Sequence, residues 1–115
     1  MVLSGDTRPS ENLIRFAKRA DLLVHEVYYV DEATLRTWPE ERIIVRHHTT
    51  PEQAGEIFSR VQPRLALYSH IGRRDVDSAK LIDLTRDEYS GPLEVGEDLM
   101  TIEVGEKIEV RRPTE

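Results

Sequence analysis

The side chains of this chain that could do chemistry are its four histidines and a few carboxylates, and they follow short apolar runs. They are Asp6 after "MVLSG", His25 and Glu26 after "DLLV", His47 and His48 after "RIIVR", and His70 after "LALYS". Imidazole nitrogen and carboxylate oxygen are the ligand types that suit zinc and similar divalent metals. The same groups exchange protons near neutral pH.

Each of these residues also has a simpler interpretation when it is taken singly. Gly5-Asp6-Thr7 is a common turn and helix-start sequence, and His70 fits a satisfied histidine at a strand end. Glu26 fits a solvated charge, and His48 fits a helix-capping region, where the positive end of the helix dipole favours a neutral imidazole. Together, at the ends of consecutive apolar runs, the residues favour a shared site.

The apolar runs and their spacing predict the elements that position these residues. Residues 1–6, 21–26 and 64–70 are predicted strands, and "RIIVR" at 42–46 is interpreted as a further short one. A helix is predicted from Pro9 and Ser10, with its apolar face at Leu13, Phe16, Ala17 and Ala20. Residues 31–38 and 77–89 are two further predicted helices, and the tail alternates as two or three short strands around Gly96 and Gly105.

The helix that follows His48 carries the clearest start signal in the chain. Thr50 fits the N-cap, Pro51 fits the first helical position and Gln53 completes a capping box. Its predicted core stripe is Ala54, Ile57, Phe58 and Val61. Pro63 then ends the helix.

Alternating strands and helices predict an α/β layered domain with a mixed sheet. Ligand sites of such sheets gather at the carboxyl ends of the strands. All four histidines, with Asp6 and Glu26, are therefore expected on one rim.

Length and composition limit the function classes. The 115 residues form one domain or part of one, and the formal net charge of −6 argues against a broad basic face for nucleic acid. The chain has no cysteine, which excludes disulfides and thiolate metal sites and fits a cytoplasmic protein. No apolar run reaches membrane-spanning length, and no signal-peptide pattern is present, so no membrane partner is expected.

Four motifs resemble the C-terminal half of the metallo-β-lactamase superfamily of metal-dependent hydrolases, and most of all its ribonuclease Z branch. They are "SGDTRP", "ADLLVHE", "HHTTPEQAG" and "LALYSHI", in the family's order, between Val2 and about Ile71. The forms "HEVYY" and "HHTT" depart from those of the branch, so the resemblance is more specific to the superfamily.

The resemblance implies a role for four residues. Asp6 corresponds to a metal-bridging aspartate and His70 to a further metal ligand, in a complete site that holds two Zn²⁺ ions, with Mn²⁺ or Fe as alternatives. His48 corresponds to a catalytic residue that donates a proton or stabilises developing charge, and Glu26 to the carboxylate that orients it. The substrate class implied is a phosphodiester or related ester, with RNA as one candidate. The duties of His25 and His47 stay open.

One departure from the family pattern concerns its main metal motif. His-x-His-x-Asp-His, which belongs to the family's N-terminal half, has no counterpart here. We therefore expect residues 1–115 to form a single partial domain, half of an αββα sandwich with helices on one face of a mixed sheet. The isolated chain is expected to be inactive and to need the missing half or a second subunit. A non-catalytic interaction module and an unrelated α/β domain that binds metal incidentally are the alternatives.

The strands are apolar on both faces, as in a sheet that is covered on both sides. In the half-domain interpretation, one sheet face lacks its partner sheet and forms an exposed apolar patch. The chain is therefore expected to form a homo-oligomer, most simply a two-fold dimer.

Overall fold

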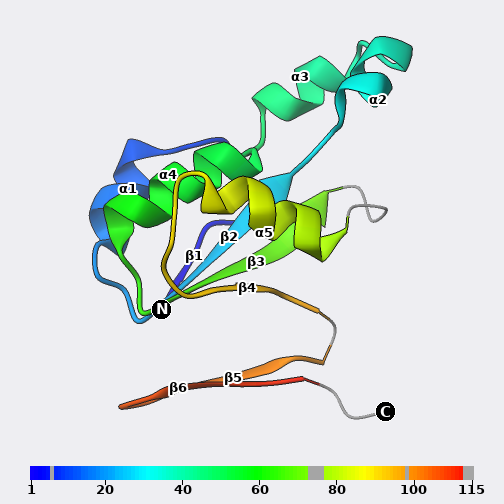
Figure 1. Cartoon of the computed structure of the whole chain (residues 1–115). Helices are drawn as coiled ribbons and strands as arrows, with labels where there is room; N and C mark the ends of the chain where they lie inside the picture. Colours follow the sequence, from blue (N-terminus) through cyan, green and yellow to red (C-terminus); the bar gives the residue numbers. More distant parts are fainter. Residues whose placement is uncertain (6, 73–76, 98, 113–115) are drawn as a thin grey trace.

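The structure is a computed structural model that describes residues 1–5, 7–72, 77–97 and 99–112 (Figure 1), without the side chain of His70. The strands of the described part are β1 (Val2–Leu3), β2 (Leu22–Tyr28), β3 (Leu65–Gly72), β4 (Leu93–Val95), β5 (Thr101–Val104) and β6 (Ile108–Arg111). Its helices are α1 (Glu11–Ala17), α2 (Glu32–Thr37), α3 (Glu41–Arg46), α4 (Pro51–Val61) and α5 (Ser78–Arg86).

The strands form two separate sheets. A four-stranded parallel sheet has the order β1-β2-β3-β4, and β5 with β6 forms an antiparallel hairpin beside it (Figure 1). Along the β2–β3 pair the register shifts once: His25 pairs with Tyr68, but Val27 pairs with Ile71. Both strand directions thus occur, and the α/β class expected from the sequence is confirmed.

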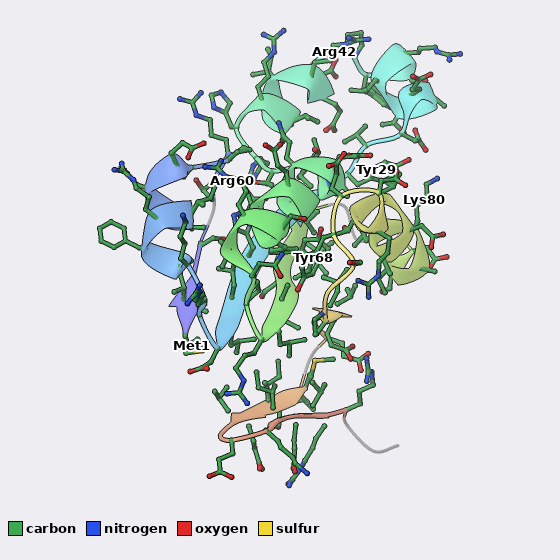
Figure 2. The ribbon with its side chains drawn as sticks, turned by 60° about the vertical axis from the view of Figure 1, so that its left-hand side comes forward. Met1, Tyr29, Arg42, Arg60, Tyr68 and Lys80 are labelled. Carbon is green, nitrogen blue, oxygen red and sulfur yellow. The ribbon has the colours of Figure 1, made fainter. Side chains whose placement is uncertain are left out.

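Helices α1, α4 and α5 cover one face of the parallel sheet and enclose the main core. The buried side chains of this core include Ile14 of α1, Phe58 of α4 and Leu81 of α5, packed over Leu23 and Tyr68 of the sheet. Figure 2 shows Tyr68 within this layer. Its hydroxyl donates to Thr85 Oγ1 at 2.5 Å, because the single Thr85 hydroxyl proton is already given to the Leu81 carbonyl.

The β5–β6 hairpin covers part of the opposite sheet face. Leu22, Leu65 and Leu67 are buried there against Met100, Ile102, Ile108 and Val110. Arg64 ties the hairpin turn to the body by donating to the carbonyls of Gly105 and Glu106 while it pairs with Asp21 at 3.1 Å. The face expected to be bare is therefore partly covered by this chain itself, although Leu3 at its edge is 64% exposed.

Helix α4 has the start and the core stripe that the sequence predicts. Thr50 accepts from Gln53 N, and the Gln53 side chain accepts from Thr50 N, which closes the capping box. Ala54, Ile57, Phe58 and Val61 are all buried. The helix ends at Gln62, whose φ of 54° is in the left-handed region.

The sequence pattern predicts a strand for the run "RIIVR", and this prediction is wrong. The run lies in helix α3. Ile43 and Ile44 are 60% and 39% exposed there, so the run contributes to no buried layer. A short apolar run has no periodicity that separates helix from strand. His47 and His48 therefore follow a helix rather than a strand end.

Helix α1 also differs from its predicted face. Ser10 is the N-cap as expected, but the helix ends at Ala17 and buries Ile14 with Ala17. Phe16 is 87% exposed. Leu13 packs against the core and Ala17 is buried, as predicted. The helix stops a turn early, with Arg19 at a positive φ of 58°, so Ala20 lies beyond it.

Helices α2 and α3 form an arm, residues 32–46, that projects away from the sheet (Figure 1). Figure 2 shows Arg42 at its outer end. Neither helix buries a residue. Within the part of the chain that the structure describes, no helix is long and apolar enough to cross a bilayer.

Candidate catalytic site

Glu26 is the centre of a polar cluster at the carboxyl end of β2. Its side chain is fully buried, and a buried carboxylate must be paired to stay charged. Oε1 accepts from the backbone N–H of Thr7 at 2.8 Å and from His48 Nδ1 at 3.0 Å, while Oε2 accepts from Thr49 N at 3.4 Å. Three donors from two distant loops thus satisfy one carboxylate.

The same two loops are joined directly to each other and to β2. Thr49 Oγ1 donates to the Thr7 carbonyl at 2.7 Å, and Tyr28 N donates to the Thr49 carbonyl at 2.8 Å. Thr49 is completely buried. The chain after β1 and the chain before α4 are therefore held in one fixed arrangement around Glu26.

His48 is held in a defined orientation and tautomer. Because the Glu26 carboxylate only accepts, the ring nitrogen that faces it, Nδ1, carries a proton. Nε2 is therefore the ring nitrogen that does not face the carboxylate. The Tyr28 ring stacks on the imidazole, with centroids 5.2 Å apart and an interplanar angle of 20°. The side chain is 23% exposed, so it is accessible to a reactant.

Tyr28 connects this site to the arm. Its hydroxyl donates to Glu41 Oε2 of α3 at 2.8 Å, while its ring lies on His48. The sequence does not predict the contact of Tyr28, nor the bonds from the backbone amides of Thr7 and Thr49 to Glu26. A signal for Tyr28 was present, since residues i and i+2 of a strand share a face and Tyr28 is two residues after Glu26.

The four histidines do not all meet on one rim of the part that is described. His47 is exposed at the end of α3, and His25 is buried on the helix-covered side of β2 against the Phe58 ring. Burial lowers the pKa of His25, because a charged imidazole would lose its hydration, although the Glu26 carbonyl and charge oppose this. Among the histidine side chains that the structure describes, His48 is the one that lies against the Glu26 carboxylate.

The two predicted metal ligands fall outside what the structure describes. Asp6 is not among the described residues, and for His70 only the backbone, within β3, is described. Among the described residues there is no group of three His, Cys, Asp or Glu side chains that could hold a metal ion. The described residues alone therefore do not fit a metal centre.

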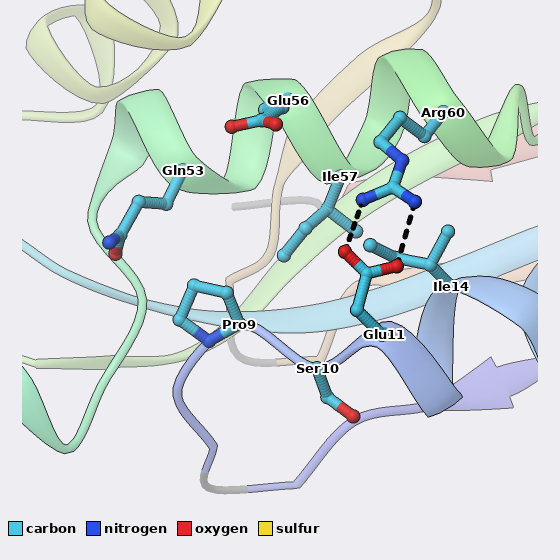
Figure 3. A pocket seen from close by; sticks show the side chains of 8 residues that line it. All are labelled: Pro9, Ser10, Glu11, Ile14, Gln53, Glu56, Ile57 and Arg60. Carbon is cyan, nitrogen blue, oxygen red and sulfur yellow. Dashed lines mark hydrogen bonds and ion pairs between the residues drawn. The ribbon is translucent and has the colours of Figure 1, made fainter.

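A small cavity of about 170 Å³ lies between the start of α1 and the outer face of α4 (Figure 3). Arg60 spans its lining with two bonds to the Glu11 carboxylate, at 2.6 and 2.7 Å. This pairing lowers the pKa of Glu11 and raises that of Arg60. Both charged groups thus have partners, and the cavity adds no reactive group to the site.

Comparisons with known proteins show which proteins this chain is similar to. The chain is 38% identical over 105 residues to ribonuclease Z of Myxococcus xanthus, covering 90% of this chain and 32% of that protein. It is 31% identical over 101 residues to ribonuclease Z of Methanothermobacter thermautotrophicus, covering 88% and 31%. The chain is therefore similar in sequence to ribonuclease Z proteins over 88–90% of its own length.

The structural comparison agrees with this relationship at the level of the fold. The metallo-β-lactamase fold protein YhfI from Bacillus subtilis matches with a TM-score of 0.63 at 20% identity, covering 83% of this chain and 36% of that one. The metallo-β-lactamase-type fold implied by the resemblance is thus confirmed. No protein-family model matches the chain. The chain spans about a third of the length of the curated relatives it matches.

Proposed function

We propose that this chain supplies the C-terminal part of a metal-dependent phosphodiester hydrolase, with His48 and Glu26 as its proton-transfer pair. The observation that carries the proposal is the buried Glu26 carboxylate, which accepts from His48 Nδ1 at 3.0 Å. A structural role alone does not require a buried carboxylate to orient a partly exposed imidazole. General acid–base catalysis does, because the imidazole must present one nitrogen in a fixed direction.

His48 acts as a general acid at the leaving oxygen of the substrate. Glu26 holds the proton on Nδ1 and stabilises the protonated ring, so that Nε2 gives its proton to the oxygen as the ester bond breaks. The stacked Tyr28 ring limits how far the imidazole can tilt out of its plane. A general acid of this kind contributes a rate factor of about 10²–10⁴.

Metal binding belongs to the complete protein in this proposal. Asp6 and His70 are two of the ligands, inferred from their place in the family motifs, and the metals are two zinc ions with Mn²⁺ or Fe as alternatives. Catalytic zinc takes about three protein ligands per ion. The further ligands must therefore come from the missing half or from a second copy of the chain.

The substrate class follows from the relatives. Because the matched proteins are ribonucleases by name, RNA is the proposed substrate. The formal net charge of −6 means that this chain offers RNA no broad basic surface. The contacts that hold the rest of an RNA substrate are therefore assigned to the missing half or the partner copy.

A chimera tests the proposal. In the Myxococcus xanthus ribonuclease Z, the 105 matched residues are replaced by this chain, and hydrolysis of a chromogenic phosphodiester is measured with Zn²⁺ or Mn²⁺. We expect turnover in the chimera. His48→Ala should lower it by about 10²–10⁴-fold with metal content unchanged, whereas Asp6→Ala and His70→Ala should lower the metal content.

His47→Ala is the matched control, because it removes the adjacent imidazole, which has no contact with Glu26 among the described residues. It should leave turnover and metal content unchanged. A folded, metal-loaded chimera without turnover would contradict the proposal and favour an interaction module. Loss of metal in His48→Ala would make His48 a ligand instead.

A further inference from the structure

The backbone of Glu26 is held by side chains rather than by a regular strand ladder. On one side, β1 pairs with β2 at Leu23 and Val24 and ends before Glu26. The Glu26 N–H donates instead to Ser4 Oγ at 3.0 Å. On the other side, the β2–β3 register shift leaves two β3 residues, 69 and 70, opposite Glu26 alone. Irregularities of this kind re-aim side chains near active sites.

The carbonyl of Glu26 is held by a hydrogen bond from the side chain of His25. Its Nδ1 lies 2.8 Å from the Glu26 carbonyl oxygen. A carbonyl only accepts, so Nδ1 carries the proton and the ring is the neutral Nδ1–H tautomer. The lowered pKa of His25 agrees with a ring that stays neutral.

This bond leaves the other ring nitrogen without a partner. His25 is 1% exposed, and among the described residues nothing bonds to its Nε2. A buried acceptor without a donor destabilises the folded state, because it loses its bond to water and gains none in return. A phenylalanine or leucine would fill the space beside Phe58 without that cost. Packing alone therefore does not explain a histidine here, whereas its Nδ1–H donor does.

We propose that His25 is a positioning residue, whose Nδ1–H bond to the Glu26 carbonyl sets the direction of the Glu26 carboxylate and so the orientation of His48. The inference rests on the proposed function, since it concerns the same Glu26–His48 pair. The backbone of Glu26 is held at its N–H by Ser4 and at its carbonyl by His25. With both ends fixed, the carboxylate accepts from Thr7, Thr49 and His48 at the same time.

The experiment uses the full chain, labelled with ¹⁵N, and measures which ring nitrogen of His48 carries the proton. Spectra are recorded at about pH 8, above the ordinary histidine pKa of about 6.5. In the wild type we expect the Nδ1–H form of His48. His25→Phe keeps the bulk but removes the donor, and should lower the Nδ1–H fraction of His48 at least two-fold.

His25→Asn is the rescue variant, because an asparagine amide N–H occupies nearly the place of Nδ1. It should restore at least half of the lost Nδ1–H fraction. Amide exchange of Thr7 and Thr49 provides a second readout, since both amides donate to Glu26. Their exchange should accelerate about ten-fold or more in His25→Phe, while that of Phe58, inside α4, should not change.

The outcomes that overturn the proposal differ from those that overturn the function. An unchanged His48 tautomer in folded His25→Phe, or equal acceleration of all three amides, would show that His25 acts on stability alone. Failure of His25→Asn to restore the tautomer would show that the donor is not what matters. Glu26→Gln distinguishes failure of the His25 proposal from failure of the proposed function. If this variant leaves the His48 tautomer unchanged, Glu26 does not set that tautomer, and the proposed function of the Glu26–His48 pair is contradicted.

Discussion

At the scale of single residues, Glu26 couples three parts of the chain that are far apart in sequence. Its carboxylate accepts from the loop after β1 and from the segment before α4, and its own position is the end of β2. These bonds are made to a charged acceptor, so each is stronger than a neutral one. The bonds to Glu26 are therefore expected to stabilise the folded chain as well as to form the site.

Glu26→Gln should destabilise the chain while keeping its shape. In glutamine one of the two carboxylate oxygens is replaced by an NH₂ group, which donates and cannot accept. This group would face a donor that the carboxylate oxygen accepts from in the wild type. We expect a loss of about 1–3 kcal/mol in the free energy of unfolding, measured by urea denaturation. Glu56→Gln, the same change on the exposed side of α4, is the control and should have little effect; equal stability of the two variants would contradict the role of Glu26.

The buried His25 predicts how stability depends on pH. Its pKa is lowered in the folded chain, so below the unfolded value of about 6.5 the unfolded state binds more protons. The contribution of His25 is fully present above that value, and stability falls as pH drops below it.

His25→Asn, which does not titrate, should lose less stability than the wild type between about pH 8 and about pH 5.5. Urea denaturation at the two pH values measures the difference. His47→Asn makes the same change at an exposed ring and is the control. A pH dependence in His25→Asn equal to that of the wild type would mean that His25 is not the group responsible.

The sequence predicts residues of the site better than it predicts their contacts. His48 and Glu26 are expected as a pair from the motif resemblance, and the structure brings them to 3.0 Å. The Thr7 and Thr49 bonds depend on backbone amides, which carry no side-chain signature. The role of Tyr28 depends on where α3 lies, and the sequence analysis interpreted that segment as a strand.

At the scale of elements, the contact between α4 and α5 depends on Gly55. A Cβ at this position would lie 2.7 Å from the Thr85 carbonyl oxygen and 2.9 Å from Glu88 Cβ. Since one of these atoms is backbone, the neighbouring helix end would have to move. The close approach of the two helices therefore requires a residue without a side chain.

Gly55→Ala should destabilise the chain although alanine favours helices. The gain in helix propensity is about 0.5–1 kcal/mol, whereas overpacking costs about 1–3 kcal/mol. We expect a net loss of roughly 1 kcal/mol or more, read from thermal or urea unfolding. Glu56→Ala, one residue on and exposed, should be neutral or stabilising. A stabilised Gly55→Ala variant would show that α5 is free to shift.

Elements that have both an apolar periodicity and signals for their ends are predictable in this chain. Elements that have only a short apolar run are not. Helix α4 has a capping box, Pro51 and a four-residue stripe, and all of these features are observed. Residues 42–46 have an apolar run without such signals, and their conformation is set by the path of the arm from β2 to α4. Helix α1 ends early before Arg19, whose backbone is in the left-handed region. No sequence pattern predicts this conformation.

At the scale of the whole molecule, the β5–β6 hairpin covers part of the sheet face that lies opposite the helices. Its apolar side chains bury Leu22, Leu65 and Leu67 on the sheet face opposite the helices. Leu3, at the edge of that face, stays 64% exposed. Association of the chain through this face stays a prediction, on a smaller area than the sequence suggested.

Removing the apolar contact of the hairpin should increase self-association. Ile102→Asp places a charge against the leucines of the sheet, and we expect a loss of about 1–3 kcal/mol with more dye binding and larger particles in light scattering. Thr101→Asp, on the same strand at an exposed position of the other face, is the control. If both variants behave alike, the hairpin does not protect the sheet.

The order of the parallel sheet, β1-β2-β3-β4, is also the order of the strands along the chain. Every strand pairing in it therefore joins strands that follow each other along the chain, although paired residues such as Leu22 and Leu65 are far apart in sequence. Parallel pairing of this kind forms slowly, because the intervening chain must be closed into a loop first. The β2–α4–β3 unit can form first, and β1 and β4 can then add at opposite edges. Such an assembly order lets this segment fold as one cooperative unit that grows outward from its central strand pair.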